Sequence, residues 1–127
     1  MFKIIYAGGN MGKIYKNENQ LLLQELIKIY QPVGFDWLSY QITKSNILTL
    51  HHVIKVADGG QLKINNSALL TKKSHRGLHI CENKDFILYS EINDFFREII
   101  SFYSPLDDYL IKESKEYKKA LTKTLYK

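Results

Sequence analysis

The stretch of sequence that decides the fold covers residues 50–79 and reads LHHVIKVADGGQLKINNSALLTKKSHRGLH. The apolar run over 47–50 predicts a strand that leads into this stretch, and the run over 62–70 predicts a second, irregular strand. Gly59 and Gly60 lie between the two runs, and they indicate a turn because glycine tolerates positive φ angles. We therefore expect two strands joined by a loop.

A helix is expected directly after the second strand. Thr71 is a suitable N-cap, and the helix should run from Lys72 to about Cys81. His75 and His79 are four residues apart, so both imidazoles should point to one face of this helix. That is a workable spacing for two metal ligands.

All four histidines of the chain lie in this region, at positions His51, His52, His75 and His79. His51 and His52 adjoin at the end of a strand, where neighbouring residues point to opposite faces. One of the two can therefore hold a metal together with the helical pair, while the other stays free as a base. The alternative is that the histidines are purely structural, but a patterned set of this kind favours a site.

The flanking sequence predicts a helical scaffold. Its apolar periodicity, with N-caps at Asn17, Ser90 and Ser104, predicts helices over residues 17–31, 90–103 and 105–125. A short strand is expected over residues 2–6, closed by a turn at 8–10. The lysines of the last helix are expected to form a solvated face, with contact to DNA as the alternative.

The composition is that of one folded domain. With 127 residues, of which 45% are hydrophobic and 24% charged, residues 1–127 fit a single domain and not a disordered chain. Cys81 is the only cysteine, which excludes an internal disulfide and a cysteine-based zinc ribbon. The uncharged runs are too short to span a bilayer, and no signal-type segment follows Met1. We therefore expect an intracellular (cytoplasmic) protein without membrane contact.

The net charge of +5 is concentrated in one segment. Residues 41–84 contain seven basic and two acidic residues, so they carry the whole of this charge. Positive charge gathered around imidazoles is what a phosphate-handling site needs, and it points to an anionic partner.

The pattern resembles the HNH nuclease motif of the ββα-metal fold, in the style of colicin-type DNases. That motif runs His-His, then Asn, then Thr-x-x-x-His-x-x-x-His, and the matching residues here are His51, His52, Asn66, Thr71, His75 and His79. The resemblance covers about a quarter of the chain. It implies an α+β fold with a ββα-metal hairpin and helix over about 47–81, flanked by one N-terminal and two C-terminal helices.

The resemblance also implies roles for individual residues. His51, His75 and His79 would bind one divalent metal ion, and His52 would be the general base that deprotonates the attacking water. Asn66 would hydrogen-bond across the loop and fix the hairpin that presents His52.

The implied activity is metal-dependent endonuclease cleavage of DNA, taken to be double-stranded. The ion would be Mg, Mn, Zn, Ni or Co, and three imidazoles favour the transition metals over Mg²⁺ for tight binding. The N-terminal amides of the helix would face phosphate, joined by the basic side chains of Lys55, Lys72, Lys73 and Arg76. A catalytically inactive nucleic-acid-binding module, or an RNA-cleaving nuclease, is the alternative, and a homodimer or a protein partner stays open.

One departure from the family concerns cysteines. Many HNH proteins hold a structural zinc with two Cys-x-x-Cys pairs, whereas here Thr71 and Ser74 occupy the positions of the second pair and no first pair exists. We therefore expect no structural zinc, and a hairpin braced by the flanking helices and aromatic residues.

Overall fold

The computed structural model describes residues 18–127. Within that range the chain is a mixed α+β protein with two antiparallel strands and four helices, as expected at this level. The elements in chain order are α1 (Glu18–Tyr30), β1 (Leu48–His52), β2 (Ser67–Thr71), α2 (Lys72–Lys84), α3 (Phe86–Phe102) and α4 (Asp108–Leu125). The predicted strand at 2–6, the turn at 8–10 and the Asn17 cap lie outside the described residues.

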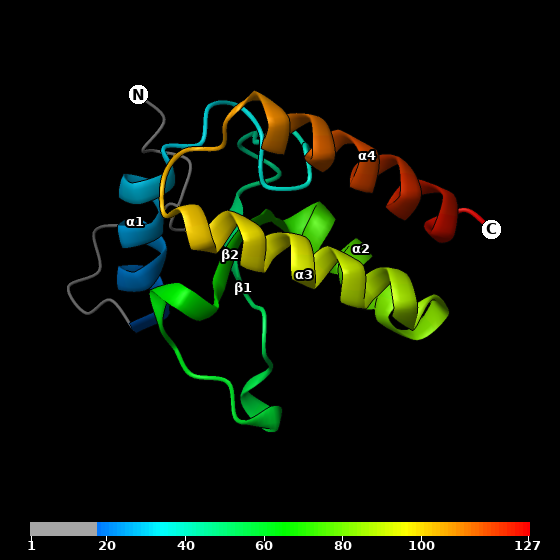
Figure 1. Cartoon of the computed structure of the whole chain (residues 1–127), viewed down its shortest axis with the longest axis horizontal. Helices are drawn as coiled ribbons and strands as arrows, with labels where there is room; N and C mark the ends of the chain where they lie inside the picture. Colours follow the sequence, from blue (N-terminus) through cyan, green and yellow to red (C-terminus); the bar gives the residue numbers. More distant parts are fainter. Residues whose placement is uncertain (1–17) are drawn as a thin grey trace.

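The two strands pair in antiparallel register from Leu48 opposite Thr71 to His52 opposite Ser67. The loop between them projects from the body of the molecule (Figure 1) and contains short 3-10 helices at Val56–Asp58 and Ile64–Asn66. The prediction that the second strand begins near residue 62 is wrong, because the second of these 3-10 helices occupies its first part. The strand is therefore short, and all five of its residues are buried.

The helix α2 follows β2 without a connecting loop. Thr71 is its N-cap, as predicted, and its side-chain oxygen accepts a hydrogen bond from the Ser74 backbone N–H at 3.3 Å. The helix continues to Lys84, beyond the predicted end at about Cys81. Cys81 itself is fully buried, which suits a small apolar side chain.

Two predicted helix starts are wrong. Ser90 lies inside α3, which begins earlier because the Asp85 carboxylate accepts the Leu88 backbone N–H at 3.1 Å and caps the helix there. Ser104 lies before α4, whose N-cap is Asp107, bonded to the Leu110 N–H at 2.9 Å. Asp85 is also the C-cap of α2, so a single residue separates α2 from α3.

The helices enclose the hairpin from two sides. Figure 1 shows α1 on one side of the strands and α2, α3 and α4 gathered on the other. The helix α2 packs against both α3 and α4, while α1 packs against β2. Aromatic residues fill the centre, where Trp37 meets the Tyr30 ring edge-on at 4.9 Å between centroids and Phe96 at 5.9 Å. No helix among residues 18–127 is long and apolar enough to cross a membrane.

A buried carboxylate ties the hairpin to the segment after α1. Asp36 is 3% exposed. One of its oxygens accepts the backbone N–H groups of Leu38 and Tyr40, at 2.8 and 3.0 Å. The other accepts the Thr71 N–H at 2.7 Å and the Ser74 hydroxyl at 2.6 Å. Thr71 and Ser74 are thus both joined by hydrogen bonds to Asp36.

Candidate metal centre

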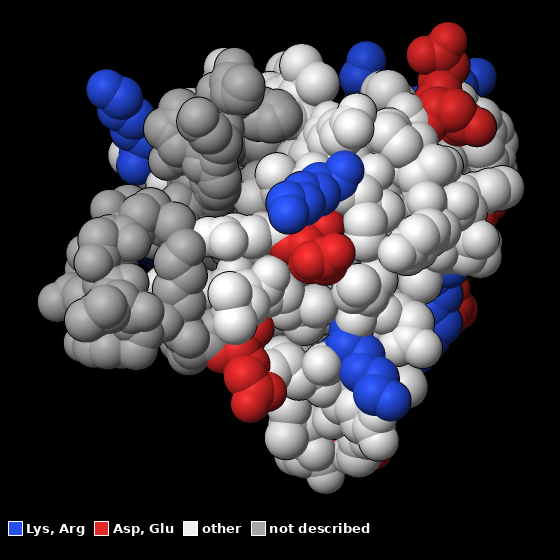
Figure 2. All heavy atoms as spheres, turned by 90° about the vertical axis from the view of Figure 1, so that its left-hand side faces the viewer, with Lys and Arg blue, Asp and Glu red and all other residues white. Residues whose placement is uncertain are grey.

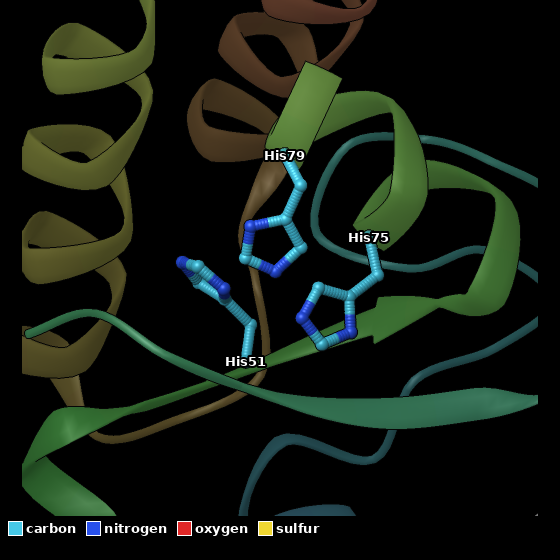
Figure 3. Close-up of side chains that lie close together, drawn as sticks. All are labelled: His51, His75 and His79. Carbon is cyan, nitrogen blue, oxygen red and sulfur yellow. The ribbon is translucent and has the colours of Figure 1, made fainter. Parts of the chain in front are cut away.

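Three of the four histidines converge at the contact between β1 and α2. His51 comes from the strand and His75 and His79 from successive turns of the helix, and their rings point toward one another (Figure 3). One nitrogen of each ring lies within 4.8 Å of the others, so the three side chains could hold a metal ion. The sequence predicted that His75 and His79 share one face of the helix. In the fold His51 lies next to that face.

The orientation of His51 is fixed from α3. His51 is 2% exposed, and its Nε2 lies 2.9 Å from Oδ1 of Asn93, which is 4% exposed. The Asn93 amide nitrogen donates to the Tyr89 carbonyl, so Oδ1 is the acceptor and His51 Nε2–H the donor. The neutral ring therefore carries its free lone pair on Nδ1.

The same reasoning fixes the tautomer of His75. Its Nδ1 lies 2.9 Å from the hydroxyl oxygen of Thr49. That hydroxyl donates its only hydrogen to the Leu70 carbonyl at 2.8 Å, so it must accept from His75 Nδ1–H. The free lone pair of His75 is on Nε2.

His79 is oriented less tightly, by a carboxylate on its own helix. Its Nδ1 lies 3.7 Å from Oε1 of Glu82, which in turn forms an ion pair with Lys55. This arrangement favours a proton on Nδ1 and leaves Nε2 for a ligand. Each of the three imidazoles thus uses one nitrogen within the protein and keeps the other free, which is how metal-ligating histidines are usually supported.

Burial keeps two of these rings neutral. The pKa of His51 is lowered to about 4 by burial, with smaller contributions from the neighbouring imidazoles, against the opposing effect of Asn93. Burial also lowers the pKa of His75 to about 4, followed by the charges of His79 and His52. Both rings are therefore unprotonated at neutral pH, the state in which imidazole binds metals.

The donor set suits a transition metal. Imidazole nitrogens at about 2.0–2.1 Å around a tetrahedral ion lie roughly 3.3 Å apart. The present nitrogens lie within 4.8 Å of one another, so small side-chain rotations suffice. Three imidazole ligands match zinc, nickel, cobalt or copper better than magnesium, which prefers oxygen ligands.

His52 is half-buried and lies on the face of β1 opposite His51, opposite Ser67 in the partner strand. It adjoins His51 in the chain, at the end of the strand. The side chain of His52 is thus not among the three converging rings.

The Asn66 side chain holds the ends of the loop together. Its amide oxygen accepts the Ile54 N–H at 2.8 Å, and its amide nitrogen donates to the carbonyls of Ile54 and Gln61, both at 3.0 Å.

The backbone of the glycine turn at Gly59 and Gly60 is equally constrained. Gly59 has a φ of +91°, and a Cβ on Gly60 would lie 1.8 Å from the Ile54 carbonyl oxygen, so no side chain fits there.

The basic residues predicted to contact phosphate fall into two groups. Lys55 is paired with Glu82 beside His79. Lys72, Lys73 and Arg76 instead line a separate hollow of about 590 Å³ at the start of α2. The prediction that the helix amides face phosphate is wrong. The N–H groups of Lys72 and Lys73 donate to the Ile47 carbonyl and the Asn46 side chain, and that of Ser74 donates to Thr71.

Three residues that support the site were not predicted from the sequence: Thr49, Glu82 and Asn93. Thr49 had a usable signal, because it stands two residues before His51 and therefore shares its strand face. Asn93 had none, since it lies 42 residues away on a helix whose apolar pattern indicates only core. A mostly apolar hollow of about 640 Å³ beside Trp37 and α4 was also not predicted, and no predicted site residue lines it.

Comparison with family models, with curated proteins and with solved structures gave no match to this chain.

Proposed function

We propose that this protein is a metal-dependent endonuclease of the HNH type, with a ββα-metal core formed by β1, β2 and α2, which hydrolyses phosphodiester bonds of DNA. The observation that carries the proposal is the convergence of three imidazoles, with one nitrogen of each within 4.8 Å of the others. The other nitrogen is hydrogen-bonded within the protein in His51 and His75, and it faces the Glu82 carboxylate in His79. Hydrogen bonds that orient His51 and His75 in this way, with a carboxylate beside His79, suit a metal site better than they suit a packed core.

His51, His75 and His79 would hold one divalent ion. A divalent ion there supplies a Lewis acid for the charge that develops on the scissile phosphate and on the leaving oxygen. Burial of His51 disfavours protonation of that ring, and the hydrogen bond to Asn93 keeps the ring from rotating.

His52 is the base in this proposal. It adjoins His51 in the chain but is not one of the three converging rings, so its ring is available to accept a proton from the attacking water. The water oxygen forms a bond to phosphorus while the bond from phosphorus to the leaving oxygen breaks. The leaving oxygen then takes a proton from solvent, which leaves one end with a phosphate and the other with a hydroxyl. Asn66 keeps the loop after β1 closed and so fixes where His52 stands.

The test is plasmid cleavage by the purified protein with Mg²⁺, Mn²⁺, Zn²⁺, Ni²⁺ or Co²⁺, beside a His52→Ala variant. We expect the wild type to nick or linearise the plasmid with at least one ion. The variant should be slower by about 10²–10⁴-fold, the usual contribution of a general base. Equal inertness of both proteins with every ion would contradict the proposal, and cleavage of RNA alone would reassign the substrate.

A further inference from the structure

The hollow at the start of α2 is lined by positive charge from two separate helices. Lys72, Lys73 and Arg76 come from α2, and Lys118 comes from α4. Tyr40 and Asn46 are among the uncharged residues that complete the lining, and among the described residues no aspartate or glutamate lines it. The sequence did not distinguish Lys118 from the other lysines of the last helix.

These four cations have no carboxylate partners within residues 18–127. The ion pairs there involve Lys55, Arg97, Lys119 and His79 instead. Figure 2 shows how a different face looks: on the side that it presents, blue and red side chains lie near one another among uncharged atoms. Four unpaired cations around one hollow repel one another, and an anion placed between them would relieve that repulsion.

Lys118 lies between the two hollows, lines both of them and is held there. Its Nζ donates to the Ser39 carbonyl at 3.2 Å and lies 4.9 Å from the centre of the Tyr40 ring. Most surface lysines lose side-chain entropy when they bind an anion, whereas this one is already partly ordered. The side chain therefore presents its charge at a defined place.

The hollow and the histidine cluster lie on neighbouring stripes of one helix. Lys72 and Arg76 are four residues apart, as are His75 and His79, and at 3.6 residues per turn each pair forms a row along α2. Because the first amides of α2 are already bonded, recognition in the hollow falls to the side chains.

We propose that this hollow binds backbone phosphates of the DNA near the cleavage site, and that Lys118 supplies its fourth cation. The inference rests on the proposed nuclease function, which does not itself require α4. Contacts of this kind position the strand without reading its sequence.

The experiment measures binding of a short fluorescent DNA duplex in EDTA, so that cleavage does not interfere, over salt concentrations of about 50 to 200 mM. The variants are Lys118→Gln, which keeps an N–H donor for Ser39, and Lys123→Gln as the matched control. Lys123 is exposed on the same helix and lines neither hollow. Circular dichroism checks that both variants are folded.

We expect Lys118→Gln to weaken binding about three- to tenfold at low salt, and to reduce the slope of log K against log salt concentration by about 1, the value for one lost phosphate contact. Lys123→Gln should change neither quantity. Equal behaviour of the two variants would overturn the inference, and so would a Lys118 dependence seen with an RNA duplex but not with DNA.

The outcome separates this inference from the proposed function. If wild-type protein cleaves plasmid but Lys118→Gln binds DNA normally, the nuclease proposal stands and the role of the hollow is refuted. If DNA binding depends on Lys118 but no ion supports cleavage, the hollow binds DNA and the nuclease proposal fails.

Discussion

Two polar clusters lie where the hairpin meets α2, and they differ in how fully their polar atoms are hydrogen-bonded. Around Asp36, both carboxylate oxygens are used, by four donors from two segments of the chain. Around His51, each of the three imidazoles keeps one nitrogen uncommitted. A closed cluster stabilises the fold, because every buried polar group in it is satisfied. An open cluster keeps free nitrogen atoms that can bind a ligand such as a metal ion. The closed cluster around Asp36 therefore serves the fold, whereas the open cluster around His51 is the candidate for function.

The largest expected effect is on the closed cluster. Asp36→Ala leaves buried donors without an acceptor, and we expect the free energy of unfolding to fall by about 3 kcal/mol or more. Urea denaturation measures this loss, which should be the same with and without a bound metal ion. A loss of stability that appeared only in the metal-bound protein would contradict the prediction, because Asp36 would then act through the metal site and not through the fold alone.

The next effect concerns the open cluster. His75→Ala should weaken binding of Zn²⁺ or Ni²⁺ by about 100-fold or more, since loss of a ligand should exceed the 10- to 100-fold typical of its supporting residues. The metal-free protein should lose little stability. His52→Ala is the control and should bind metal normally in the same calorimetric titration. If His52→Ala weakened binding more than His75→Ala, the two roles would have to be exchanged.

A smaller loss is expected from the residue that orients His51. Asn93→Leu removes the acceptor at nearly the same volume, so the ring is free to rotate, and metal affinity should fall about 10- to 100-fold. Asn93→Asp keeps an acceptor oxygen and should retain most of the affinity. Comparable loss in both variants would mean that Asn93 acts through packing alone.

The last prediction concerns how the stability of the metal-free protein depends on pH. Proton binding to the open cluster should have the smallest effect on stability of all these changes when the pH is near neutral. In the folded, metal-free protein the pKa values of His51 and His75 are lowered to about 4, whereas an unfolded histidine has a pKa near 6.5. Between these values the unfolded chain binds more protons, so stability should fall as pH drops from about 6.5 toward 4 and stay level above that range. Denaturation of the metal-free protein at several pH values tests this. A double variant, His51→Gln with His75→Gln, should flatten the dependence.

The parts of the fold that the sequence predicted are those set by local pattern. The order of strands and helices, the Thr71 cap and the shared face of His75 and His79 follow from residues within one or two turns of each other. The starts of α3 and α4 were misjudged because Asp85 and Asp107 compete with nearby serines, and a carboxylate cap resembles any surface aspartate in a sequence.

The parts that the sequence did not predict depend on distant segments. Asp36 meets Ser74 across 38 positions, Asn93 meets His51 across 42, and Lys118 meets Ser39 across 79. No periodicity links such pairs, since each depends on how the helices pack. The candidate ligands were therefore predictable, whereas the groups that orient them and the second wall of the basic hollow were not.

Because a single residue connects α2 and α3, the orientations of the two helices depend on each other. Asp85, at φ −150° and ψ 82°, ends one helix and caps the next, and no flexible linker absorbs a change in their angle. His75 and His79 lie on α2, and Asn93 lies on α3. A tilt of α3 would move Asn93 away from His51 and free that ring to rotate. The packing of α3 would therefore influence how well the three imidazoles are arranged to bind a metal ion.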